Sequence, residues 1–247
     1  MRERGIVLAA TLLALSATTA SAADAFVPLF NGRDLAGWKI PVGDNGHWRV
    51  TDGVIDYDAR SEAAGDKSLW TERSFGDFVL RAEWRFKETP FINPHAQIIL
   101  PDGSPKRGAD GTPIQIAVPD SDSGIYLRGD SKSQVNIWCW PVGSGEVYGY
   151  RTDLAMPPEV RAGVTPRTNA DHDIGQWNAF VITMVGDRLT VVLNGIKVID
   201  NARLPGVAPR GPIALRHHGE WKDGGWQGPP SLVQFRNIEF RELGGSQ

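Results

Sequence analysis

Alternation of apolar and polar residues along short segments constrains the fold of this chain more than any other feature. The longest example is Phe78-Val-Leu-Arg-Ala-Glu-Trp-Arg-Phe86. Successive side chains of a β-strand point to opposite faces, so Arg81, Glu83 and Arg85 share one face and the large apolar residues share the other. We expect a strand with one face in a core and the other face exposed.

A second run, Asp122-Ser-Gly-Ile-Tyr-Leu-Arg128-Gly-Asp130, follows the same period. Its apolar face carries Ile125 and Leu127, and we expect this face to be core. A polar sheet face flanked by aromatic residues is typical of a site for a sugar-sized ligand. The residues predicted on that polar face are Asp122, Gly124, Tyr126 and Arg128.

Short runs of this kind recur through the chain, and Gly, Pro, Asn and Asp separate them. No long stretch has a convincing 3.6-residue period, so the chain predicts antiparallel β-structure throughout. Asp52-Gly53 and Asn194-Gly195 are typical of two-residue hairpin turns. The other predicted strands cover residues 47–50, 54–57, 68–71, 135–140, 146–151, 177–185, 188–193, 196–199, 213–217 and 232–240.

The first 22 residues have the pattern of an export signal peptide. Arg2 and Arg4 give a positive start, residues 6–15 are apolar, and Ala20-Ser-Ala22 is a typical cleavage site. We predict a mature chain that starts near Ala23, in the periplasm or outside the cell. No later apolar run reaches the roughly 18 residues of a membrane span, so no span is predicted.

The length that remains suits one domain. Removing 22 residues from 247 leaves 225, and we predict a single all-β domain over residues 24–247. Cys139 is the only cysteine, so no intramolecular disulfide can form and stability must come from the core. A net charge of -3 with both signs interspersed argues against a nucleic-acid partner and favours neutral or mildly polar ligands.

Two stretches are predicted as long loops. Residues 87–120 are rich in Pro and Gly but contain two short apolar runs, so we expect a small hairpin within this loop. Residues 220–231 hold Trp221 and Trp226 among glycines and prolines. Two indoles in a polar loop favour stacking on a sugar face.

Glu146, Tyr148 and Tyr150 alternate in the predicted strand 146–151. Sharing one face, they would suit hydrogen bonding and stacking to a hydroxyl-rich ligand. The alternative is a sheet surface on which the tyrosines pack against neighbouring side chains.

Several motifs occur together and in a fixed order: Phe30-Asn-Gly-Arg-Asp-Leu-Ala-Gly-Trp38, Trp48-Arg-Val-Thr-Asp-Gly53, Asp77-Phe-Val-Leu-Arg-Ala-Glu83, Asp122-Ser-Gly-Ile-Tyr-Leu-Arg128-Gly and Gly211-Pro-Ile-Ala-Leu-Arg-His-His218-Gly219. With them the chain resembles the 3-keto-disaccharide hydrolase domain family from Phe30 to its C-terminus. The resemblance implies a concanavalin-like jelly roll, which is a β-sandwich of two curved antiparallel sheets. It also implies a ligand groove on the concave side.

Three residues match functional positions of that family. Glu83 falls on its strand glutamate, Arg128 on the arginine that closes its Asn-Ser-Gly-Ile motif, and His218 on the histidine of its Gln-x-His-Gly motif. Two positions depart from it, because Asp122 stands where Asn is usual and Arg216 where Gln is usual.

Two further departures concern the surroundings of the groove. Residues 87–120 replace a much shorter connection. Gln134 and Asn136 are amides where the family tends to have Glu and Gln. The charge pattern of the groove therefore differs from that of the family.

The activity implied by the resemblance requires a base. The hydrogen on C2 of a 3-keto sugar is acidic, so the C1 substituent can leave by proton removal and elimination, followed by addition of water. We predict Glu83 or His218 as the base and Arg128, together with Arg216, as the group that stabilises the enolate. A divalent metal ion could also stabilise it, with His218 and either Glu83 or Glu146 as ligands. The predicted substrate-binding residues are Asp122, Gln134, Asn136, Trp138, Glu146, Tyr148, Arg216, Trp221 and Trp226.

Each catalytic candidate also has a structural interpretation. Glu83 can pair with neighbouring arginines, and Arg128 can pair with Asp122 or Asp130. Of the adjacent histidines, alternation allows only one to face the groove.

The predicted function is an exported enzyme that cleaves 3-keto-glycosides, with a carbohydrate as its ligand. One alternative is a carbohydrate-binding module without catalysis. The other is a glycoside hydrolase with two carboxylates, such as Glu83 and Glu146, on either side of the scissile bond.

Overall fold

The computed structural model of the chain describes residues 25–244. The predicted signal peptide, residues 1–22, lies outside this range. Within it, no helix has the length and the apolar character needed to cross a membrane.

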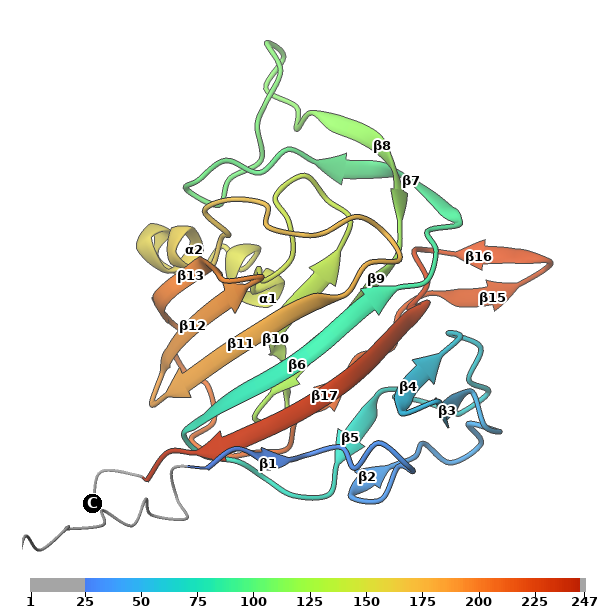
Figure 1. Cartoon of the computed structure of the whole chain (residues 1–247). Coiled ribbons are helices and arrows are strands. Elements are labelled where there is room, and N and C mark those ends of the chain that lie inside the picture. Colours follow the sequence, from blue (N-terminus) through green and yellow to red (C-terminus); the bar gives the residue numbers. More distant parts are fainter. Residues whose placement is uncertain (1–24, 245–247) are drawn as a thin grey trace, which may run out of the picture.

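Two antiparallel sheets form the body of the molecule, which confirms the predicted β-sandwich (Figure 1). The larger sheet contains β1 (Val27–Pro28), β3 (Trp48–Thr51), β4 (Val54–Tyr57), β6 (Phe78–Phe86), β11 (Asn178–Val185), β12 (Arg188–Leu193), β13 (Ile196–Arg203) and β17 (Val233–Glu242). Its order is β13-β12-β11-β6-β17-β4-β3, and β1 also pairs with β17. The smaller sheet has the order β10-β9-β14-β5-β2. It contains β2 (Trp38–Lys39), β5 (Leu69–Thr71), β9 (Asp122–Leu127), β10 (Asp130–Trp138) and β14 (Ala214–Leu215).

The core lies between the two sheets. Leu80 and Phe235 reach it from the larger sheet, and Ile125 and Ile137 reach it from the smaller sheet; all four are at most 1% exposed. This is the layer arrangement that the period-2 pattern predicts, because each sheet buries one face against the other. The second face of the smaller sheet therefore points away from the core.

Two further hairpins extend from the sandwich. The predicted hairpin within residues 87–120 is present as β7 (Phe91–Gln97) paired with β8 (Gln115–Asp120). Residues 87–120 are called the insertion below. Only Ser121 separates β8 from β9, so the insertion leads directly into the smaller sheet. The predicted loop 220–231 also contains a hairpin, β15 (Glu220–Lys222) with β16 (Gly225–Gln227).

The prediction of a strand over residues 146–151 is wrong. The backbone of Gly145 and Glu146 pairs with Asn136 at the edge of β10, but the chain then turns into α1 (Tyr148–Arg151). Gly149 fits against the backbone of Lys132, where a Cβ atom would lie 2.6 Å from the carbonyl oxygen. A second short helix, α2 (Pro158–Gly163), follows. Tyr148 and Tyr150 consequently do not share a sheet face.

Both predicted hairpin turns are confirmed. Asp52 and Asn194 have φ values of 51° and 51°, and each precedes a glycine with positive φ. A third turn of the same kind, Arg128-Gly129, joins β9 to β10 with φ values of 53° and 77°. The strand therefore ends at Leu127, and Arg128 leaves the polar face that it shares with Asp122 in the predicted alternation.

Candidate active site

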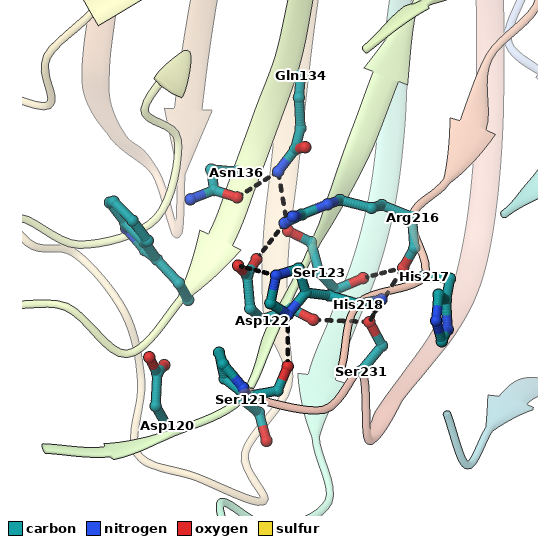
Figure 2. A network of polar contacts seen from close by, with 12 residues as sticks. Asp120, Ser121, Asp122, Ser123, Gln134, Asn136, Arg216, His217, His218 and Ser231 are labelled. Carbon is teal, nitrogen blue, oxygen red and sulfur yellow. Dashed lines mark hydrogen bonds and ion pairs between the residues drawn. The ribbon is translucent and has the colours of Figure 1, made fainter. Parts of the chain in front are cut away.

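A pocket of about 260 Å³ lies on the outer face of the smaller sheet. This volume is slightly below the roughly 300–1,000 Å³ of drug-sized ligand sites, so it suits a single sugar ring. The pocket brings together most of the predicted substrate-binding residues with His218. Figure 2 shows Asp122, Gln134, Asn136 and Arg216 around His218. Its lining consists of Asn93, Asp120, Asp122, Gln134, Asn136, Trp138, Trp140, Tyr148, Arg216, His218 and Pro229.

The floor of the pocket is built from β9 and β10. Antiparallel pairing sets Asn136 opposite Gly124, and the side chain of Gln134 lies over that glycine. A Cβ atom on Gly124 would lie 2.5 Å from Nε2 of Gln134, so the position has no room for a side chain. Nε2 of Gln134 donates to the carbonyl oxygen of Ser123 at 3.1 Å and also to Oδ1 of Asn136. The floor is therefore a fixed amide surface.

Residues 216–218, which follow β14 (Ala214–Leu215), continue to alternate between the two faces of the smaller sheet. The backbone N–H of Arg216 donates to the carbonyl of Gly124, which keeps this segment paired with β9. Arg216 and His218 line the pocket. His217 points to the other side, where its Nδ1 lies 2.7 Å from the hydroxyl oxygen of Tyr57. Burial lowers the pKa of His217 to about 4. Only one of the two adjacent histidines thus faces the groove, as alternation predicts.

The ring of His218 is held in one orientation. Its Nδ1 lies 2.7 Å from the carbonyl oxygen of Pro229. A carbonyl oxygen only accepts hydrogen bonds, so Nδ1 carries the proton and Nε2 of the neutral ring has a free lone pair. Nε2 lies 3.7 Å from Oδ2 of Asp122. The arrangement matches a general base oriented by a second group.

Ser231 connects the backbones of His218 and Asp122. Its hydroxyl accepts from the N–H of His218 at 2.6 Å and donates to the carbonyl oxygen of Asp122 at 2.7 Å (Figure 2). The relative positions of the imidazole and the carboxylate are therefore determined by the main chain as well as by their side chains.

Asp122 and Arg216 form an ion pair. Nη1 of Arg216 donates to Oδ1 of Asp122, and the two side chains are only 13% and 18% exposed. Because the carboxylate and the guanidinium contact each other, their charges compensate, and the guanidinium remains beside the pocket.

An aromatic wall closes one side of the pocket. The rings of Trp138 and Trp140 stack with centroids 4.2 Å apart and planes 7° apart. Tyr148 packs edge-on against Trp138 at 6.0 Å. Flat aromatic surfaces beside polar side chains are suited to the two faces of a sugar ring.

Asp120 and Asn93 reach the pocket from the insertion, and neither is among the site residues predicted from the sequence. Burial is the main cause that raises the pKa of Asp120 to about 6. Asp120 stands two residues before Asp122, so extending the strand alternation backwards would have placed both carboxylates on one face. For Asn93 no local signal exists, because only the folding of the hairpin brings it to the site.

Glu83 lies on the opposite side of the sandwich from the pocket. It is on the outer face of β6, where Nε of Arg236 donates to Oε2 at 2.7 Å and Nδ2 of Asn237 donates to Oε1 at 2.9 Å. The structure does not bring it together with His218.

Arg128 also lies outside the pocket. It is 2% exposed, and its guanidinium donates to the carbonyl oxygens of Gly76, Gly186 and Ala208 and to Oδ1 of Asp77. The residues that it contacts lie in loops between strands, and neither Asp122 nor Asp130 forms an ion pair with it.

Three of the predicted substrate-binding residues do not line the pocket. Glu146 is fully buried, where it accepts a hydrogen bond from Nε of Arg151. Trp221 lines a different pocket, next to Arg60, and Trp226 packs against it with ring centroids 5.0 Å apart. The predicted metal ligands Glu83, Glu146 and His218 are thus in three separate places. Within residues 25–244, no three His, Cys, Asp or Glu side chains are grouped to hold a metal ion.

Comparison with solved structures shows the fold. Three crystal structures of inferred glycosyl hydrolases from Parabacteroides distasonis are among the most similar. The first has a TM-score of 0.56 and 23% identity and covers 88% of this chain and 84% of its own. The second has a TM-score of 0.53 and 14% identity, with 92% and 98% covered. The third has a TM-score of 0.51 and 19% identity, with 89% and 100% covered.

Sequence comparisons gave two results. No curated protein matches the chain. A family model described as a 3-keto-alpha-glucoside-1,2-lyase-like domain matches residues 25–241, which is nearly the whole of the described chain. The chain therefore belongs to the family of 3-keto-alpha-glucoside-1,2-lyase-like domains.

Proposed function

We propose that this protein cleaves 3-keto-glycosides, with His218 as the base that removes the proton from C2 of the sugar. The observation that carries the proposal is the fixed ring of His218, whose Nε2 faces the pocket beside Asp122 and Arg216. Family membership supports the substrate class.

The reaction proceeds in four steps at one site. Nε2 of His218 takes the C2 proton, and the negative charge that develops on the C3 oxygen is stabilised by the guanidinium of Arg216. The electrons then return to form the C1–C2 double bond, and the C1–O bond breaks. Water adds to C1, and the imidazolium, whose N–H exchanges with the solvent, donates a proton to C2. The sum is glycoside plus water giving a free 3-keto sugar and an alcohol.

Asp122 has two functions in this scheme. Its Oδ1 holds Arg216 in place, and its Oδ2 lies close enough to His218 to stabilise the imidazolium after proton transfer. The half-buried indole of Trp140 and the exposed ring of Tyr148 offer flat surfaces for the sugar ring, while Gln134 and Asn136 offer amides for its hydroxyl groups.

The test uses a 3-keto-α-glucoside in deuterated water with the wild type and two variants. Release of the alcohol and deuterium incorporation at C2 are both measured. We expect His218→Gln to lower the rate by about 10²–10⁴-fold and to abolish deuterium incorporation, since general-base catalysis is typically of that size. We expect Arg216→Gln to lower the rate by about 10²–10³-fold.

Glu83→Gln separates this assignment from the prediction made on the sequence. Its carboxylate lies on the far side of the sandwich, so we expect turnover to stay within about twofold of the wild type. A loss as large as that of His218→Gln would contradict the assignment and make Glu83 the base.

The stacked tryptophans also favour a second candidate, a carbohydrate-binding module. In that case the wild type and both pocket variants would bind the sugar without turnover. Cleavage of an unoxidised glucoside without deuterium at C2 would instead indicate ordinary glycoside hydrolysis. Export by residues 1–22 remains a prediction, which N-terminal sequencing of the mature protein would check.

A further inference from the structure

Asp120 is a carboxylic acid in the pocket wall to which the scheme above assigns no role. It is 1% exposed, and it is the last residue of β8, the strand that closes the insertion. Among the described residues it forms no hydrogen bond with Asp122 or His218, and Figure 2 shows it apart from them. Besides the neighbouring Asp122 and His218, the pocket therefore contains a separate carboxyl group.

Three donors hold the side chain of Asp120. Nδ2 of Asn93 donates to Oδ2 at 2.8 Å, Nε1 of Trp140 donates to Oδ2 at 3.3 Å, and the N–H of Cys139 donates to Oδ1 at 3.2 Å. Asn93 belongs to β7, so the insertion supplies both the acid and one of the groups that position it. A buried, positioned carboxyl group is typical of catalytic acids.

Two effects keep a proton on this group. Burial disfavours the charged form and is the larger effect, and the negative charge of Asp122 acts in the same direction, so that the pKa rises to about 6 despite the bond from Asn93. Asp120 is thus protonated over a wider pH range than a carboxyl group in water. This supports a role as a donor of protons.

The chemistry of the proposed reaction requires such a donor. In an α-glucoside the C1–O bond and the C2–H bond are both axial and lie on opposite faces of the ring. A base on one face therefore removes the C2 proton while the leaving oxygen departs on the other. His218 cannot serve both faces at once, so a second group has to protonate the departing oxygen.

We propose that Asp120 is the general acid of the reaction and donates its proton to the glycosidic oxygen as the C1–O bond breaks. The inference rests on the proposed function and assigns a catalytic role to the insertion of residues 87–120, which delivers this side chain to the pocket.

The protons balance over one cycle. The proton of Asp120 goes to the glycosidic oxygen, which leaves as an alcohol, while the C2 proton goes to His218. The carboxylate of Asp120 then removes a proton from the water that adds to C1 and becomes neutral again. His218 donates a proton to C2, so both side chains regain their starting states.

The test compares two substrates that differ only in the leaving group, methyl and para-nitrophenyl 3-keto-α-glucoside. A nitrophenolate leaves without protonation, whereas methoxide does not. We expect Asp120→Asn to lower kcat/KM for the methyl glycoside by about 10²-fold or more. The loss for the nitrophenyl glycoside should stay below about tenfold, and C2 deuterium exchange should persist.

Asp110→Asn is the matched control in the same insertion. Asp110 is exposed and only caps its own turn, through Thr112. We expect both substrates to be cleaved at the wild-type rate.

Equal losses for both substrates, or no loss for either, would overturn the assignment of Asp120 and leave the proposed function intact. Failure of the wild type to cleave either substrate would overturn the proposed function and this inference with it. If Asp120→Asn does not fold, a series of leaving groups with the wild type decides the question. A rate that hardly changes with leaving-group acidity supports the general acid, and a steep dependence overturns it.

Discussion

At the scale of single residues, Arg128 shows how a charged side chain can be part of the framework. Its guanidinium is buried at the turn between β9 and β10 and binds three carbonyl oxygens and one carboxylate from other connections. Burial lowers the pKa of Arg128, while the charge of Asp77 opposes this effect. The residue joins the end of the smaller sheet to loops of the larger one.

Replacing Arg128 by methionine should therefore destabilise the protein. The change removes the guanidinium donor from three carbonyl oxygens and the ion-pair partner from Asp77, and breaking a buried ion pair costs about 3–5 kcal/mol. We expect a loss of that size in the free energy of unfolding, measured by urea denaturation. Arg81→Met is the control, because Arg81 is exposed and its contact with Glu239 is 4.0 Å long. Similar stabilities for the two variants would contradict the framework role.

At the scale of elements, the two hairpins that extend from the sandwich differ in their relation to the pocket beside His218. The β7–β8 hairpin supplies Asn93 and Asp120 to the pocket. The β15–β16 hairpin carries Trp221 to a separate pocket of about 490 Å³, where the guanidinium of Arg60 lies 4.3 Å from the centroid of its ring. Only the first hairpin is positioned to contact a sugar bound beside His218.

Aromatic variants should distinguish the pocket beside His218 from the pocket at the β15–β16 hairpin. We expect Tyr148→Ala to raise KM for a simple 3-keto-glucoside by several-fold, up to about tenfold, since this pocket-lining ring is 45% exposed and stacking is worth roughly 0.5–1.5 kcal/mol. We expect Trp221→Ala to leave KM within about twofold. Steady-state kinetics on the two variants is the measurement. A larger effect of Trp221→Ala would place the sugar over the β15–β16 hairpin.

At the scale of the whole molecule, buried titratable groups link stability to pH. Burial raises the pKa of Glu146 to about 7 against the opposing charge of Arg151, and it lowers the pKa of His217 to about 4. Between its unfolded and folded pKa values Glu146 binds its proton more tightly in the folded state, so its contribution to stability falls as pH rises. For His217 the unfolded state binds the proton more tightly, so stability rises with pH below about 6.5.

Glu146→Gln isolates one of these contributions. The variant cannot ionise at this position, and its amide oxygen can still accept a bond from Arg151. We expect the wild type to lose stability relative to the variant between about pH 5 and about pH 8, as Glu146 loses its proton inside the protein. Urea unfolding of both proteins at the two pH values measures this. A difference that does not change with pH would mean that Glu146 is already ionised at pH 5.

Much of the fold follows from local sequence. The strands at 78–86 and 188–193 and the turns Asp52-Gly53 and Asn194-Gly195 depend on side-chain alternation and on positive φ, which a few neighbouring residues specify. The prediction of a strand over residues 146–151 is wrong because the close packing of Gly149 against Lys132 favours a helix there. Arg128 was misplaced because the Arg-Gly pair was not recognised as a hairpin turn.

The sequence by itself determined the β-sandwich and the polar face that carries Asp122, Gln134 and His218, because the period of a strand is a local property. It also determined the family, because the motifs and their order can be read along the chain. The tertiary structure alone decided which charges meet. Glu83 and His218 both alternate with core residues, but the two sheets turn their outer faces in opposite directions. Asn93 joined the pocket through long-range packing of a hairpin, and the spacing of residues along the chain does not encode that contact.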